Sequence, residues 1–115
     1  MKIVINCDYG GFGLSDEALR EYAKRKGLNL VEEGPDRFGF THFYVDSKSD
    51  KNYFSDRDIE RNDPILVEIV ETLKSQKASS RYASLKVVEI PEGVNWYIVE
   101  HDGMEHIAER HRTWQ

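Results

Sequence analysis

The sequence predicts an α+β fold, with a single mixed β-sheet of about four to five strands and two α-helices on one face of the sheet. β-Branched and apolar runs at residues 2–6, 41–45 and 85–90 are typical of strands. Two stretches, which begin near Ser15 and Asp63, repeat their apolar residues with helical spacing instead. The order of these elements along the chain favours the α+β class.

The length and composition indicate one folded unit. At 115 residues the chain has the usual size of a single domain, and we expect one globular domain over residues 1–115. Five Phe, six Tyr and two Trp argue against disorder, because large apolar side chains can offset the chain entropy that folding removes. A charged fraction of 32% predicts a small core beneath a strongly charged surface.

The charge distribution limits the classes of partner. The net charge is −5, and the Lys and Arg residues are interspersed with carboxylates, whereas nucleic-acid binding requires a clustered basic surface. We therefore expect no nucleic-acid partner. No apolar run has the length of a secretory signal or a membrane span, so we expect no membrane association and a cytoplasmic location.

A strand, a glycine-rich loop and a helix follow one another at the start of the chain. Residues 2–6 form the strand, and residues 9–13 then break its pattern. Ser15 is a suitable N-cap and Gly27 a suitable C-cap for the helix between them. Further along we expect an extended piece at 30–31, a turn at 34–36 and a strand at 41–45.

The middle of the chain combines a long polar stretch with a second helix. Residues 46–62 are dominated by Ser, Asp, Lys and Asn and predict a surface loop. Asp63 as N-cap and Pro64 as first helical residue predict the start of the helix. Its end lies within residues 76–84, which carry no clear stop signal.

The last third of the chain predicts an antiparallel unit. Residues 85–90 and 94–100 are typical of two strands with a turn between them. Asp102-Gly103 is a two-residue hairpin signal. Residues 104–110 fit either a third strand or a short helix, so we expect a C-terminal antiparallel meander or hairpin.

Motifs at both ends of the chain resemble a known family. The opening reads KIVIN and then YGGFGLSDEAL, the second helix begins with Arg61-Asn62-Asp63-Pro64, and the closing segment reads LKVVEIP and then VNWYIVEHDGMEHIAERHRTW. These motifs cover most of the chain and resemble small, uncharacterised proteins encoded by bacteriophages and prophages. The resemblance implies an origin and no chemistry. Members of the family often carry Cys directly before the Tyr-Gly-Gly, whereas this sequence has Asp8 there and its cysteine at Cys7.

The glycine-rich loop is the first candidate ligand site. It lies between a strand and a helix N-terminus, where free N–H groups and the helix dipole attract anions. No Lys follows it as in a P-loop, and the full G-x-G-x-x-G spacing is absent. The alternative is a tight turn that lets its phenylalanine pack beneath the helix. The candidate ligand-binding residues are Tyr9, Gly10, Gly11, Phe12, Gly13 and Ser15.

Other reactive residues support weaker hypotheses. Cys7 follows a strand and precedes a helix, which would favour a thiolate. No histidine lies near it in the sequence, so a small buried cysteine is favoured over a nucleophile. The histidines and carboxylates between residues 101 and 111 lack metal-ligand spacing, so we expect no metal and no cofactor.

The C-terminal tail offers candidate interface residues. Arg112 and Trp114 place a basic group beside an aromatic one, and both residue types are frequent anchors at interfaces. We take them, together with Trp96, as interface candidates. Trp114 could instead close one end of the core.

Two functional hypotheses follow. The favoured one is a non-enzymatic phage accessory protein that binds a protein partner, with a homodimer as one form of that interaction. The other is a binder of a small phosphate-bearing ligand or nucleotide at the glycine-rich loop. An exposed apolar patch would favour the first, and a concave site with convergent N–H groups the second. No catalytic constellation emerges from the sequence, so an enzymatic activity is disfavoured.

Overall fold

The computed structural model describes residues 1–110 of the chain. Within them lie two helices, α1 (Asp16–Lys26) and α2 (Pro64–Ala78). The strands are β1 (Lys2–Asn6), β2 (Leu30–Glu33), β3 (His42–Val45), β4 (Tyr53–Phe54), β5 (Leu85–Glu89), β6 (Trp96–His101) and β7 (Met104–Glu109). The predicted α+β class and the two predicted helices are confirmed. Neither helix in this part of the chain is long and apolar enough to cross a bilayer.

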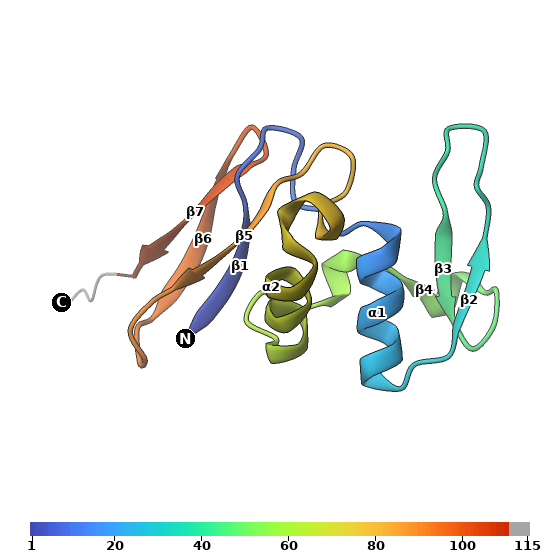
Figure 1. Ribbon diagram of the computed structural model, residues 1–115, viewed down its shortest axis with the longest axis horizontal. Coiled ribbons are helices and arrows are strands. Elements are labelled where there is room, and N and C mark those ends of the chain that lie inside the picture. The colour runs from blue at the N-terminus through green and yellow to red at the C-terminus, as the bar shows by residue number, and fades with distance from the viewer. Residues whose placement is uncertain (111–115) are drawn as a thin grey trace, which may run out of the picture.

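The strands form three small sheets. β1 pairs with β5, β3 lies between β2 and β4, and β6 pairs with β7. Every strand pair within residues 1–110 is antiparallel, so the prediction of a single mixed sheet is wrong. Figure 1 shows the reason: α1 and α2 lie side by side as a middle layer, with β1 and β5 on one side and β2–β4 on the other. α2 therefore packs against β1 and β5, and α1 packs against the β2–β4 sheet through contacts such as Tyr22 on Phe54.

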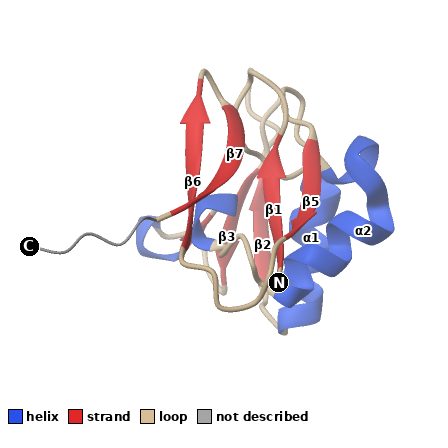
Figure 2. Cartoon of the chain, turned by 90° about the vertical axis from the view of Figure 1, so that its left-hand side faces the viewer, coloured by secondary structure: helices blue, strands red, loops and turns tan. Residues whose placement is uncertain are grey.

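β1 is buried on both of its faces. Val4 belongs to the core that the helices share with the sheets, and its neighbours Ile3 and Ile5 point to the opposite face of the strand. The β6–β7 hairpin lies beside β1 on that side (Figures 1 and 2). The strand is thus enclosed between the helices and the hairpin, as its unbroken apolar sequence predicts.

The predicted helix ends are confirmed. The Ser15 side chain accepts a hydrogen bond from the Ala18 N–H, and Gly27 ends α1 in a left-handed conformation. Asp63 caps α2 by accepting from the Ile65 N–H, and Pro64 is the first residue of that helix. These signals are local, which is why they can be predicted from the sequence.

The stretch 46–62 differs from the predicted surface loop. It contains the short strand β4 and two 3₁₀ turns, Asp50–Asn52 and Asp56–Asp58. Phe54 and Ile59 are buried in the core, and the Phe54 ring stacks on Tyr22 at a centroid distance of 6.2 Å. Because polar residues dominate this stretch, the sequence pattern does not predict that Phe54 and Ile59 are buried.

The C-terminal segment forms the predicted hairpin. Residues 104–109 are a strand, β7, and its register with β6 pairs Trp96 with Glu109 and His101 with Met104. The open alternative of a helix over residues 104–110 is therefore wrong. The interface candidates Arg112 and Trp114 lie outside the described residues.

Candidate functional site

The glycine-rich loop is packed tightly between two other loops. A Cβ atom on Gly10 would collide with Tyr82, and one on Gly103 would collide with the backbone of Tyr9 and Gly11. The loop therefore lies between segment 80–84 and the β6–β7 turn. Close backbone approach explains Gly10, as the tight-turn alternative anticipated.

Three amide groups near the α1 N-terminus donate hydrogen bonds within the chain. The Leu14 N–H donates to Asp56 Oδ2 at 3.0 Å, and the Ser15 N–H donates to the Ala78 carbonyl oxygen at 2.8 Å. The Ser15 hydroxyl oxygen accepts a hydrogen bond from the Ala18 N–H at 3.1 Å. These three N–H groups are therefore not open to an anion, because a carboxylate, a carbonyl and a hydroxyl of the protein accept their hydrogen bonds.

Asn6 fixes the loops around this region. It is fully buried, and its side-chain amide donates to the carbonyl oxygens of Asp8 and Gly103, both at 2.7 Å. Its Oδ1 accepts from the N–H groups of Asp8 at 3.2 Å and Ser84 at 2.8 Å. One side chain therefore ties the end of β1 to both neighbouring loops.

The turn between β2 and β3 is held by Asp36. Its Oδ1 accepts from the N–H groups of Phe38 at 2.8 Å and Phe40 at 3.1 Å, and its Oδ2 lies 2.9 Å from His42 Nε2. The His42 imidazole, followed by the Phe40 and Phe38 N–H groups, lowers the pKa of Asp36 below its usual value. An ionised Asp36 thus fixes a turn whose two phenylalanines point into solvent.

Four aromatic side chains are exposed on these loops. Their exposed fractions are 67% for Tyr9, 63% for Phe38, 51% for Phe40 and 62% for Tyr82. We call this set the aromatic edge. The three loops that carry it lie at the upper end of the molecule in Figure 1.

Arginines accompany the aromatic edge. The guanidinium carbon of Arg37 lies 4.9 Å from the centre of the Phe38 ring, and that of Arg81 lies 5.7 Å from the centre of Phe40. Arg81 directly precedes Tyr82, whose backbone and Cβ pack on Gly10, so the Arg81-Tyr82 segment contacts both the glycine-rich loop and the turn that carries Phe40.

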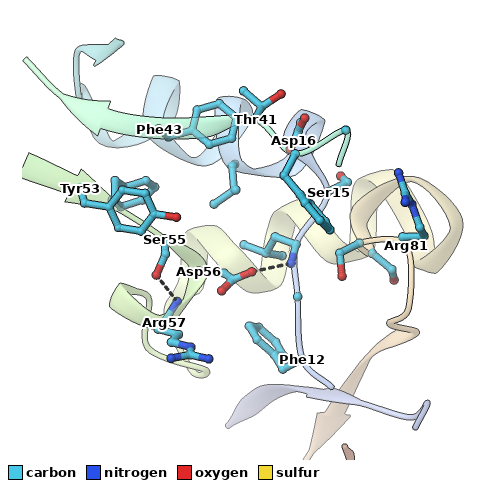
Figure 3. Close-up of a pocket in the computed structure, with 18 residues that line it drawn as sticks. Phe12, Ser15, Asp16, Thr41, Phe43, Tyr53, Ser55, Asp56, Arg57 and Arg81 are labelled. Carbon is cyan, nitrogen blue, oxygen red and sulfur yellow. Dashed lines mark hydrogen bonds between the residues drawn. The ribbon is translucent and has the colours of Figure 1, made fainter. Parts of the chain in front are cut away.

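A hollow of about 680 Å³ lies below Phe40 and Arg81. Figure 3 shows its labelled residues: Phe12 and Ser15 come from the glycine-rich loop and the helix start, Tyr53 and Asp56 from the region of β4, and Phe43 from β3. Arg57 and Arg81 lie on opposite sides of the view. A concave site is therefore present beside the glycine-rich loop, and Phe12, Gly13, Leu14 and Ser15 contribute to its lining.

A smaller hollow of about 460 Å³ adjoins the first and shares Phe12, Asp56 and Arg57 with it. Its base is an ion pair in which Arg61 donates to both oxygens of Glu105, at 2.7 and 2.8 Å. The Arg61 guanidinium carbon lies 3.5 Å from the centre of the Phe12 ring. Phe12 therefore packs on an ion pair and does not lie beneath α1 alone.

The remaining predicted residues are not gathered at this site. Trp96 is half-buried and lies at the end of the β6–β7 hairpin opposite the 102–103 turn. Cys7 is exposed, so the expectation of a buried cysteine is wrong. Within residues 1–110 no three metal-ligating side chains lie close enough to share an ion.

Of the four aromatics at the aromatic edge, the sequence predicts a binding role only for Tyr9. Phe38, Phe40, Arg81 and Tyr82 were not singled out, although Arg37-Phe38-Gly39-Phe40 directly follows a predicted turn between two extended segments. Two phenylalanines in such a turn cannot both reach a core, and that conflict was the available signal.

The fold and the site define the class of protein: a small α+β protein that presents aromatic and arginine side chains on fixed loops above a hollow. Comparison of the chain with protein-family models, with curated proteins and with solved structures finds no match.

Proposed function

We propose that this protein is a non-enzymatic binding protein that recognises a protein partner through the aromatic edge. The observation that carries the proposal is the exposure of Tyr9, Phe38, Phe40 and Tyr82, each at least half accessible, on adjoining loops. Fully burying one such side chain is worth about 1.5–3 kcal/mol, so four of them form a strong driving force for association.

The rigidity of the loops supports this function. Asp36 accepts from the Phe38 and Phe40 N–H groups, and Asn6 donates to the carbonyl oxygen of Asp8, which precedes Tyr9, so polar side chains fix the backbone at three of the four aromatics. A surface that is ordered before binding loses less conformational entropy when the partner arrives. Folding alone does not explain why polar side chains hold aromatic rings in water.

The resemblance to phage and prophage proteins supports a partner in the host cytoplasm, either a host protein or another phage protein. The exposed, unpaired thiol of Cys7 fits such a reducing compartment. If the partner is a second copy of the chain, the same surface forms a homodimer. Sedimentation of the purified chain distinguishes a homodimer from a chain that binds a different protein.

A random peptide library displayed on phage tests the proposal. The native chain is the target, and the variant Tyr9→Ser, Phe38→Ser, Phe40→Ser, Tyr82→Ser is the control, after circular dichroism has verified its fold. We expect sequences that bind the native chain and not the variant. A selection that yields only sequences binding both forms equally contradicts the proposal.

A second candidate function is the binding of a small phosphate-bearing ligand in the larger hollow. The observation in its favour is the presence of Arg57 and Arg81 in the lining, beside the glycine-rich loop. Nucleotides and phosphorylated metabolites that bind the folded state would raise the melting temperature by mass action. Loss of such a shift in Arg81→Gln would place the ligand in this hollow, and a flat screen would remove this candidate.

A further inference from the structure

We infer that the larger hollow receives an acidic segment of the partner, with an aromatic side chain of that segment in the hollow and its carboxylates on Arg57 and Arg81. This inference rests on the proposed function and specifies the chemistry of the partner. The hollow lies below the aromatic edge, and Phe40 and Arg81 line its rim. A partner bound to the edge would therefore reach the hollow past these two side chains.

The lining of the hollow fits an aromatic anchor. Leu19, Phe43 and Phe54 are buried at its base, and the partly exposed rings of Phe12, Phe40 and Tyr53 contribute to its walls. A volume of about 680 Å³ is within the range of pockets that enclose a drug-sized ligand, and a tryptophan or phenylalanine side chain is smaller than that. Aromatic rings favour other aromatic rings in offset or edge-to-face contact.

The charges around the hollow fit carboxylates. Arg57 and Arg81 are exposed, and within residues 1–110 neither forms an ion pair, whereas Arg20, Arg25 and Arg61 are each paired with a glutamate. Guanidinium groups recognise carboxylates in a bidentate geometry. The Phe40 ring contacts one face of the Arg81 guanidinium and helps to orient it. The two arginines are therefore available for a partner, in a chain whose net charge is −5.

The same hollow disfavours a nucleic-acid strand, although aromatic rings and arginines also occur in single-strand binding sites. Asp16 and Asp56 line it together with the arginines, and a continuous phosphate backbone would meet both carboxylates. A peptide carries its charges on spaced side chains, so it can place carboxylates on the arginines and direct uncharged groups toward the aspartates.

The peptides selected on the native chain test the inference. Enriched sequences are synthesised with a fluorescein label, and their affinity is measured by fluorescence anisotropy for the native chain, Arg57→Gln, Arg81→Gln and Arg110→Gln. Arg110 is the matched control, because it is exposed, lies over the Tyr97 ring at 4.8 Å and belongs to the far end of the β6–β7 hairpin. A labelled single-stranded oligonucleotide of mixed sequence is measured in parallel.

We expect enriched sequences with an aromatic residue flanked by Asp or Glu, whose affinity falls about fivefold in Arg57→Gln and in Arg81→Gln and stays unchanged in Arg110→Gln. Edge-dependent peptides without an acidic excess, or without sensitivity to the two arginines, overturn the inference and leave the proposed function standing. An oligonucleotide that binds more tightly than every peptide also overturns it. A selection that finds no edge-dependent peptide overturns both proposals.

Discussion

At the level of single residues, Asn6 joins parts of the chain that are far apart in the sequence. Its side chain bonds to Asp8, Ser84 and Gly103, and no polar atom of it is left without a partner. A buried amide of this kind is stabilising only while every bond is made, since each unpaired polar group costs free energy. The residue that opens the glycine-rich loop thus determines the position of its neighbours.

Asn6→Ala should lower the free energy of unfolding by about 3 kcal/mol, because four partly buried backbone groups lose their partner. Urea unfolding followed by circular dichroism measures the change. Asn95→Ala is the matched control, since Asn95 is exposed and the hydrogen bond it makes in the described chain uses its backbone carbonyl. Equal losses in the two variants would refute the role assigned to Asn6.

Asp63 links the two helices, and its pKa in the folded protein differs from its usual value. Burial raises the pKa of Asp63, but the hydrogen bonds from the Tyr22 hydroxyl, the Ile65 N–H and Lys26 outweigh it, so the pKa lies below the usual 3.8. A group with a depressed folded-state pKa contributes stability above its unfolded pKa and loses it as the pH falls through the folded value. The acid side of the stability profile therefore depends on this carboxylate.

Asp63→Asn should lower the stability at pH 7 by about 1–2 kcal/mol and flatten its decline below about pH 4, because the amide still caps α2 but cannot ionise. Urea midpoints measured between about pH 2.5 and 7 test this prediction. Asp46→Asn, at an exposed carboxyl after β3, should keep the native decline. A native-like decline in Asp63→Asn would show that other carboxylates control acid unfolding.

At the level of elements, Arg61 and Glu105 take the place of a third strand beside β1. Val4 donates its N–H to the Arg61 carbonyl and accepts from the Arg61 guanidinium, while the Asn6 N–H donates to Glu105. The edge of β1 opposite β5 is thereby satisfied without a further strand. This arrangement explains why β1 and the β6–β7 hairpin form separate sheets although they lie side by side.

Glu105→Leu alone should cost about 3–5 kcal/mol, because it leaves the Arg61 charge partly buried without its partner. The double variant Arg61→Met, Glu105→Leu should recover part of this loss, since no uncompensated charge remains. It should not recover all of it, because backbone groups of Val4 and Asn6 lose hydrogen bonds. A double-mutant cycle by urea unfolding gives the coupling, and strictly additive losses would contradict it.

α2 contains a break at Lys74, whose φ of 66° and ψ of 167° are not helical. This region of backbone conformation is costly for any residue with a Cβ. The turn after the break brings two carbonyls to the start of α1, where Lys77 accepts from the Ser15 hydroxyl and Ala78 from the Ser15 N–H. The break therefore lets the end of one helix cap the other.

Lys74→Gly should raise the melting temperature, with a gain of about 1 kcal/mol, because glycine adopts this conformation without strain. Thr72→Gly, two residues earlier at an exposed helical position, should lower stability by roughly 0.5 kcal/mol. Differential scanning calorimetry of both variants provides the comparison. Effects of the same sign would argue against strain at Lys74.

The sequence predicts elements better than their assembly. Capping by Ser15, Gly27, Asp63 and Pro64 is local, and so is the strand character of residues 2–6, so both were predicted correctly. The division into three sheets depends on long-range contacts such as Arg61 with Glu105, which leave no periodic signal. The sequence also predicts correctly that the glycine-rich loop lies between a strand and a helix. It does not predict the carboxylate that accepts from the Leu14 N–H, because Asp56 lies 42 residues further along the chain.

At the level of the whole molecule, the proposed binding surface presents arginines on an acidic chain, with Asp16 and Asp56 lining the hollow beside them. The chain carries −5 overall, whereas Arg37, Arg57 and Arg81 stand at or below the aromatic edge. An acidic partner would therefore be attracted by a small region and repelled by the remainder. Such an arrangement favours orientation of the partner over raw affinity.

Salt should weaken binding only in part. Raising NaCl from about 50 mM to about 500 mM screens the arginine–carboxylate contacts but leaves aromatic burial intact. We expect the affinity of selected peptides to fall about tenfold and then level off. Anisotropy titrations at several salt concentrations test this, with the Arg57→Gln, Arg81→Gln double variant as the control that should respond less. An unchanged affinity across the series would speak against charge recognition.

The hydrogen bond from Asn6 to Gly103 has a consequence for biosynthesis. The ribosome makes Tyr9 early, but the turn against which its loop rests is made more than ninety residues later. A growing polypeptide therefore has the aromatic rings and lacks the support that orients them. We expect the partner to be recognised only after the 102–103 turn has been translated, so nascent chains that lack this turn would not compete for it.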